Sequence, residues 1–152
     1  MAHVELSVSE PADPVVLGAL PFDRSSAMES WCGVVLQAAE PCLVVSEFQT
    51  IEAASMTACR LLGLAGPTVA RGVSLYAGAI RFVDFAKLPG PLPEGDLDKI
   101  PPVLAFRSGR LARGLLRIHA GDGDPARTLD AVATPLMEGG KVVGSLTFLS
   151  PI

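Results

Sequence analysis

The chain has 152 residues, of which 49% are apolar and 18% are charged, and its formal net charge is −4 at pH 7. This length predicts a single domain that can form a hydrophobic core without metal ions or disulfide bonds. An acidic chain lacks the basic surface that nucleic acids require, so we expect no nucleic-acid partner. No apolar run reaches membrane-spanning length, so we expect no membrane partner either.

The N-terminal sequence and the cysteines indicate a cytoplasmic protein. The opening residues, MAHVELSVSEPADP, lack the basic and then apolar layout of a secretory signal peptide. Cys32, Cys42 and Cys59 are an odd number of cysteines without metal-type spacing, as expected for reduced thiols in a reducing compartment. We therefore expect a cytoplasmic location and no metal site.

The N-terminal part of the chain predicts a tail followed by one helix. Residues 1–22 contain prolines and only short apolar alternation, which indicates a tail. Residues 23–40 predict a flanking amphipathic helix, in which Ser26 and Glu29 form a capping box. Apolar residues then recur at helical spacing: Met28, Trp31, Cys32, Val35, Leu36 and Ala39. This stripe belongs either to an ordinary core helix or to one shared with a second subunit.

The next segment predicts two strands and a short helix. The strands, over 42–47 and 49–54, form a hairpin. Ser55 is placed to cap the helix that follows, and Gly63 fits its left-handed end. Residues 65–100 are interrupted by glycine and proline, which predicts short helical turns and an exposed loop.

The C-terminal third predicts one helix and three strands. The helix begins at Pro101 or Pro102, because proline is tolerated in a first turn, and it ends near Gly109. The strands, over 114–120, 127–134 and 141–149, are joined by glycine-containing turns. With the first hairpin, this order predicts an α+β fold: a five-stranded antiparallel sheet with short helices on one face and an N-terminal flanking helix.

Residues 41–152 resemble a PAS domain. The stretch EPCLVVSEFQTIEAASMTACRLLGL is similar to the opening hairpin and first helix of that family, with Ser55 at the usual Asn position. RGVSLYA and FVDF are similar to the segment after that helix, and PPVLAFRSG to VGSLTF is similar to the last helix and closing hairpins. The resemblance lies in the order and spacing of these pieces. It implies a stand-alone bacterial sensory or regulatory module.

The resemblance also implies a pocket beneath the short helices. Alternate residues of a strand face opposite sides of a sheet, and one nearly uncharged set would line the concavity where ligands of the family bind. The expected pocket-wall residues are Tyr76, Phe85, Phe106, Leu116, Ile118, Leu129, Ala131 and Leu146. These side chains either surround a small apolar ligand or fill the cavity as a core, and both alternatives stay open.

The other set of strand residues is expected to face outward beneath the flanking helix. We expect a homodimer in which the helix over 26–39 packs across this face. Its expected interface residues are Trp31, Val35, Leu36, Val143 and Leu149. Arg113 and Arg117 are expected to bind a regulatory protein in trans, because the chain ends at LSPI where PAS proteins with an attached output domain continue into a helix. The alternative is that these arginines are merely solvated.

Two cofactors known from PAS proteins are not expected here. Flavin-type photosensors need a cysteine in the helix after Gly72 and a Gln on the last strand. No cysteine follows Cys59, and Leu146 occupies the Gln position. Haem-type sensors usually use a histidine of the late helical segment, and none occurs between His3 and His119. We expect neither flavin nor haem, which leaves an unidentified small apolar ligand as the alternative to no cofactor.

The residues do not predict an enzyme. Catalysis needs a base or nucleophile in an enclosed site, and Cys42 and Cys59 have no evident histidine partner. The leading hypothesis is a stand-alone PAS-type signalling or regulatory module that acts through protein contacts. The first alternative is a structural dimerisation or scaffold protein with a filled core. The second is a small α+β enzyme of the cyclase type.

Overall fold

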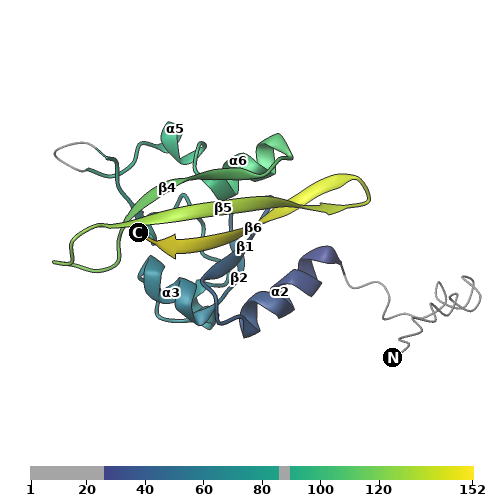
Figure 1. Ribbon diagram of the computed structural model, residues 1–152, viewed down its shortest axis with the longest axis horizontal. Helices are drawn as coiled ribbons and strands as arrows, with labels where there is room; N and C mark the ends of the chain where they lie inside the picture. The colour runs from purple at the N-terminus through teal and green to yellow at the C-terminus, as the bar shows by residue number, and fades with distance from the viewer. Residues whose placement is uncertain (1–25, 86–89) are drawn as a thin grey trace, which may run out of the picture.

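The computed structural model describes residues 26–85 and 90–152, so the tail predicted over 1–22 lies outside the described residues. Within them, six antiparallel strands form one sheet in the order β2-β1-β6-β5-β4-β3 (Figure 1). The strands are β1 (Cys42–Ser46), β2 (Ile51–Ala54), β3 (Arg81–Phe82), β4 (Ala112–His119), β5 (Arg127–Glu138) and β6 (Lys141–Pro151). The helices are α2 (Ala27–Gln37), α3 (Met56–Leu62), α4 (Pro67–Ala70), α5 (Glu94–Leu97) and α6 (Pro101–Ser108).

The predicted α+β class is confirmed, but the predicted five strands become six. The additional strand, β3, pairs with the outer edge of β4 through Arg81 opposite His119 and Phe82 opposite Ile118. It was missed because a strand of two residues is too short to show alternation, and glycine and proline follow it closely. Its position matters because it forms one wall of the cavity described below.

Helix boundaries follow the capping residues that the sequence predicts. The Ser26 hydroxyl accepts a hydrogen bond from the Glu29 backbone N–H, and the Ser55 hydroxyl accepts one from the Ala58 N–H. Gly63 ends α3 in the left-handed conformation, with φ of 75°, which glycine adopts without a steric penalty. The flanking helix is shorter than the predicted 23–40, since its helical residues are those of α2.

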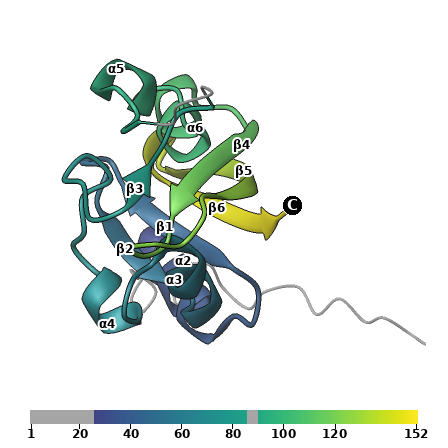
Figure 2. The same ribbon diagram turned by 90° about the vertical axis from the view of Figure 1, so that its left-hand side faces the viewer.

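Helices cover both faces of the curled sheet (Figures 1 and 2). On the concave face, α3, α4 and α6 bury Leu62, Ala70 and Val103 against strand residues such as Ile118 and Leu129. On the opposite, outward face, α2 buries Val35 in a second cluster with Cys42, Val44, Ala53, Leu136 and Leu146. The outward face is therefore already partly occupied within one chain.

The structure reverses the two faces that we predicted for β6. Leu149 packs in the concave core opposite Ala131, whereas Leu146 packs on the outward face with Val35. The prediction of Leu146 as a pocket-wall residue and of Leu149 as an interface residue is therefore wrong. Because helices cover both faces, β6 carries apolar residues in both of its alternating sets. Hydrophobicity alone could not distinguish its inner side from its outer side.

Candidate functional site

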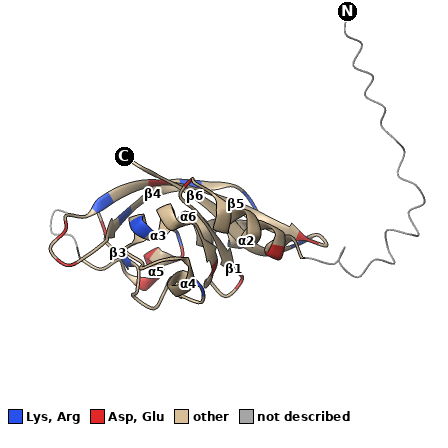
Figure 3. Cartoon of the chain, turned by 90° about the horizontal axis from the view of Figure 1, so that it is seen from below, with Lys and Arg blue, Asp and Glu red and all other residues tan. Residues whose placement is uncertain are grey.

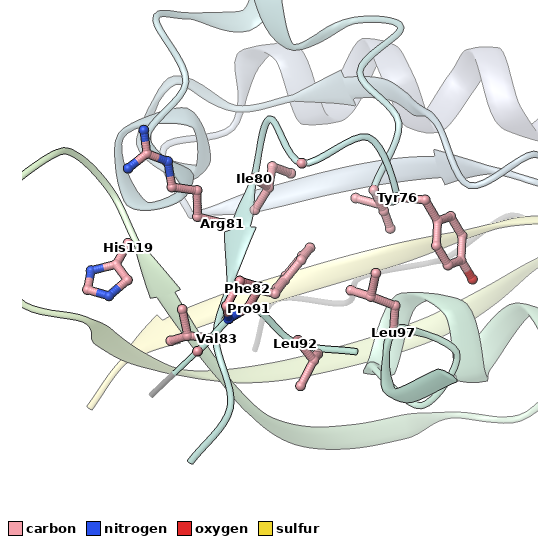
Figure 4. Close-up of a pocket in the computed structure, with 12 residues that line it drawn as sticks. Tyr76, Ile80, Arg81, Phe82, Val83, Pro91, Leu92, Leu97 and His119 are labelled. Atoms are coloured by element: carbon pink, nitrogen blue, oxygen red, sulfur yellow. The ribbon is translucent and has the colours of Figure 1, made fainter. Parts of the chain in front are cut away.

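A cavity of about 450 Å³ opens beside β3, between the segment that follows α4 and the segment that contains α5. We call it the ligand cavity. Apolar side chains line most of it, and three of them, Ile80, Phe82 and Leu92, lie close together in its middle (Figure 4). The full lining is Leu75, Tyr76, Gly78, Ile80, Arg81, Phe82, Val83, Gly90, Pro91, Leu92, Leu97 and His119.

Backbone pairing at the edge of the sheet builds one wall of the ligand cavity. The Leu92 N–H donates to the Phe82 carbonyl at 3.0 Å, and the Asp84 N–H donates to the Gly90 carbonyl at 3.1 Å. Val83 and Pro91 form an antiparallel bridge between these bonds. Because proline has no N–H to donate, it is suited to such an edge position. The wall is thus a short extension of β3 rather than a free loop.

Polar groups around the ligand cavity already have partners within the protein. The guanidinium of Arg81 forms an ion pair with Asp122 at 2.5 Å and points away from the apolar side chains (Figure 4). The Nδ1 atom of His119 lies 3.1 Å from the Asp124 carbonyl oxygen. The Tyr76 hydroxyl donates to Asp98 Oδ1 at 2.6 Å. The lining therefore suits an apolar molecule better than a charged one.

The comparisons with known proteins support the architecture at low sequence identity. No family model matches the sequence, and no curated protein matches it. The Vibrio cholerae VqmA dimer, described as a LuxR-type receptor, has a TM-score of 0.57 at 12% identity over 81% of this chain and 50% of its own. A PAS domain from Colwellia psychrerythraea has a TM-score of 0.56 at 16% identity, over 82% of this chain and 95% of its own. A Rhodobacter sphaeroides LOV protein has a TM-score of 0.57 at 12% identity, over 83% of this chain and 66% of its own.

The chain has the PAS fold. The resemblance seen in the sequence is thereby confirmed for the fold, and identities this low carry no more than the fold. The chain spans about half the length of the VqmA chains that it matches.

A second, much smaller space borders the ligand cavity in the concave core. It measures about 10 Å³ and shares Leu75, Ile80 and Phe82 with the ligand cavity, and we call it the inner void. Its lining residues are Leu43, Leu62, Leu75, Ile80, Phe82, Pro102, Leu116, Thr147 and Leu149. Leu129 and Ala131, which were expected to be pocket-wall residues, are fully buried in the core.

Few of the predicted pocket-wall residues reach the ligand cavity. Tyr76 lines it, and Leu116 lines the inner void. Phe85 is exposed and Phe106 faces a different surface hollow, while Ile118 is a fully buried core residue. The residues that sequence reasoning missed, chiefly Leu75, Ile80, Leu92 and Leu97, lie in the glycine- and proline-rich segment that shows no periodicity.

The predicted interface residues divide into exposed and buried ones. Trp31 and Leu36 are exposed on α2, and Val143 is half-buried against the same helix cluster. Val35 is only 1% exposed because α2 packs on its own sheet, so it is not available to a second chain. The prediction of Val35 as an interface residue is therefore wrong. A stripe of this kind looks the same in sequence whether its partner is its own sheet or another subunit.

Positively and negatively charged residues are spread along the helices, strands and loops of the described chain (Figure 3). Arg113 makes two hydrogen bonds to the carboxylate of Asp130, at 3.1 and 2.6 Å, and stays largely exposed. Arg117 is half-buried and borders a smaller hollow beside β4. The two arginines thus differ in setting, since Arg113 is the one of the two that pairs with a carboxylate among the described residues.

The cysteines among the described residues form no disulfide bond, and the two buried ones are expected to be unreactive. Burial raises the pKa of the Cys42 thiol and of the Cys59 thiol, so both stay protonated and are poor nucleophiles at neutral pH. In residues 26–85 and 90–152, no group of three His, Cys, Asp or Glu side chains is placed to hold a metal ion. None of the helices in these ranges has the length and apolar character that a membrane crossing requires.

Tyr76 gives this region a pH dependence that can be measured directly. Burial and, after it, the hydrogen bond to the Asp98 carboxylate raise the pKa of Tyr76 from its ordinary value of 10.0 to about 12. An unfolded chain ionises this tyrosine first, so the contribution to stability is complete below pH 10 and falls as the pH rises toward 12. Because Tyr76 is the one tyrosine of the chain, phenolate absorbance should show a midpoint near 12.

A matched pair of variants tests the cause of that shift. Asp98→Asn should move the phenolate midpoint toward 10, because it removes the accepting carboxylate. Asp96→Asn should leave it in place, since Asp96 pairs with Lys99 instead. A wild-type midpoint at 10 would contradict the hydrogen bond.

Proposed function

We propose that this chain is a signalling or regulatory module of PAS fold that binds a small apolar molecule in the ligand cavity and acts through protein contacts. The observation that carries the proposal is the ligand cavity itself. Its volume of about 450 Å³ lies in the range of small-molecule sites, which is roughly 300–1,000 Å³. Its lining is mostly apolar, and its polar groups are held by other residues.

The solved structures of the same fold support a ligand-binding role. One VqmA structure is described as bound to DPO, and the Rhodobacter protein is described as a LOV protein. We propose no catalytic activity for the present chain, because its buried thiols are protonated and His119 is engaged with a backbone carbonyl. Free cysteines also support the proposed cytoplasmic location.

We further propose a homodimer formed through the outward face. On α2, Trp31 is 40% and Leu36 is 53% exposed, and on the sheet Leu115 and Phe148 are exposed as well. Burying one side chain of this size contributes about 1.5–3 kcal/mol, so a few of them suffice to hold two chains together. The paired Arg113 and the neighbouring Arg117 then remain for a regulatory protein in trans. The net charge of −4 supports a protein partner rather than a nucleic acid.

The small size of the inner void favours one competing function. With an inner void of only about 10 Å³, the molecule could serve as a scaffold that dimerises and binds no ligand. The two functions differ at the ligand cavity, which a scaffold would not use.

Native mass spectrometry of the freshly purified protein tests the proposal. We expect a dimer of the 15.8 kDa chain that carries additional mass from a small molecule. Leu97→Arg should remove this molecule, because it places a charge in the apolar lining. Leu104→Arg is the matched control, since Leu104 is exposed on α6 and lies outside the ligand cavity.

The same measurement tests dimer formation independently of ligand binding. Trp31→Asp combined with Leu36→Asp should give monomers that still carry the small molecule. Leu111→Asp, at another exposed leucine in the turn before β4, should stay dimeric. A protein without bound mass, unresponsive to added apolar compounds, would support the scaffold instead.

A further inference from the structure

We propose that the Thr147 hydroxyl is the deep hydrogen-bonding point of the ligand site, and that Leu75, Ile80 and Phe82 form a movable partition in front of it. The inference rests on the proposed function, because the ligand reaches Thr147 from the ligand cavity. It narrows the class of ligand to an apolar molecule whose leading end carries a hydroxyl or carbonyl group.

The first observation is a buried hydroxyl without a partner. Thr147 is 0% exposed, and its Oγ1 makes no hydrogen bond to any of the described residues. The hydroxyl of Ser145, two residues earlier on the same face of β6, donates to the Pro102 carbonyl at 2.9 Å. A buried hydroxyl that lacks a partner destabilises the protein, so such groups are rare and call for an explanation.

A trapped water explains this hydroxyl poorly. A buried water needs roughly 10–15 Å³ and at least two polar partners, and the inner void of about 10 Å³ is at the lower limit of that volume. Every other side chain that lines the inner void is apolar. Valine, which has nearly the shape of threonine, would satisfy the packing at this position without the cost of the hydroxyl. The hydroxyl is therefore explained by a partner that arrives with a ligand.

The second observation is that one set of side chains separates the two spaces. Leu75, Ile80 and Phe82 line both the ligand cavity and the inner void. The Phe82 ring lies in the middle of the ligand cavity, next to Ile80 (Figure 4). Strand pairing with Ile118 and the bond from the Leu92 N–H fix the Phe82 backbone, so its ring can move by rotation about χ1 while the wall stays intact. That rotation joins the two spaces.

The position of Thr147 also links the site to the outward face. β6 lies between β1 and β5, and Thr147 pairs with Leu43 on one side and Ala133 on the other. Its chain neighbours point the opposite way: Leu146 packs with α2, and Phe148 is exposed. A ligand that is hydrogen-bonded to Thr147 thus contacts the strand that also carries Phe148, a residue of the proposed dimer interface.

Phenol and toluene are matched probes for this inference, because they differ by a hydroxyl in place of a methyl group of similar size. We expect the wild type to bind phenol about tenfold more tightly than toluene, as one additional hydrogen bond provides. Thr147→Val should abolish this preference and leave the melting temperature unchanged or higher. Thr134→Val, on the outward side of β5, is the matched control and should keep the preference. Phe82→Ala should bind both probes more tightly and retain the preference for phenol.

Methyl resonances of Leu92 and Leu97 distinguish the two levels of the proposal. If both probes shift these resonances but Thr147→Val keeps the preference for phenol, the role of Thr147 is overturned and the ligand cavity stands. If neither probe shifts them in the wild type or in Phe82→Ala, the proposed function fails together with this inference. Loss of the preference in Thr147→Val alone supports both.

Discussion

Val35→Asp is expected to lower the free energy of unfolding by about 3–5 kcal/mol, whereas Val34→Asp should change it by less than about 0.5 kcal/mol. The two valines are neighbours on α2, but Val35 is 1% exposed and Val34 is 58% exposed. Val35 packs in the outward cluster with Val44 and Leu146, where a carboxylate has no partner and no water. Urea denaturation followed by circular dichroism measures both variants.

Comparing the two valine substitutions tests whether α2 packs on its own sheet or on a second chain. If α2 packs on its own sheet, only Val35→Asp is destabilising, and it exposes the apolar residues beneath the helix. If α2 instead leaves its sheet to pack on a second chain, the effect of Val35→Asp should vanish on dilution to the monomer. Equal effects of the two substitutions would contradict the observed orientation of α2.

The sequence was most informative where local chemistry dominates. Ser26, Ser55 and Gly63 were predicted from capping preferences, and each has its expected role because a cap depends only on residues within one turn. The long strands β4 and β5 alternate clearly, so Leu129 and Asp130 were placed on the correct faces. These features need no knowledge of distant contacts.

The faces of β6 and the position of the ligand cavity could not be predicted from the sequence, because pairing between distant strands determines both. Leu146 and Leu149 belong to a strand covered on both sides, and its faces are set by pairing with β1 and β5 rather than by its own pattern. The ligand cavity depends on β3 and its partner segment at 90–92, which are joined by a few backbone bonds across a proline-rich stretch. Neither arrangement leaves a period of two or 3.6 residues that could be recognised.

Gly144 shows how closely α2 and β6 approach, and its substitution should be the second most damaging change. A Cβ at this position would collide with the Val45 backbone carbonyl of β1 and lie 2.5 Å from the Met28 Cε of α2. Gly144→Ala should therefore cost about 3 kcal/mol, at the upper end of the range for overpacking. Gly33→Ala is the matched control: its Cβ meets nothing within 4 Å and lies within α2, so it should stabilise the protein by about 0.5–1 kcal/mol.

The opposite signs of the two glycine substitutions can be measured in one set of urea denaturation curves, and a third variant identifies which contact matters. The Met28 side chain is flexible and can move aside, but the Val45 carbonyl belongs to a strand that pairs with β6 itself. Adding Met28→Ala to Gly144→Ala should therefore recover little stability, because the collision with the backbone persists. Full recovery would show that α2, and not the spacing of β1 and β6, requires glycine at position 144. A stabilising Gly144→Ala would contradict the close approach of the two strands at this point.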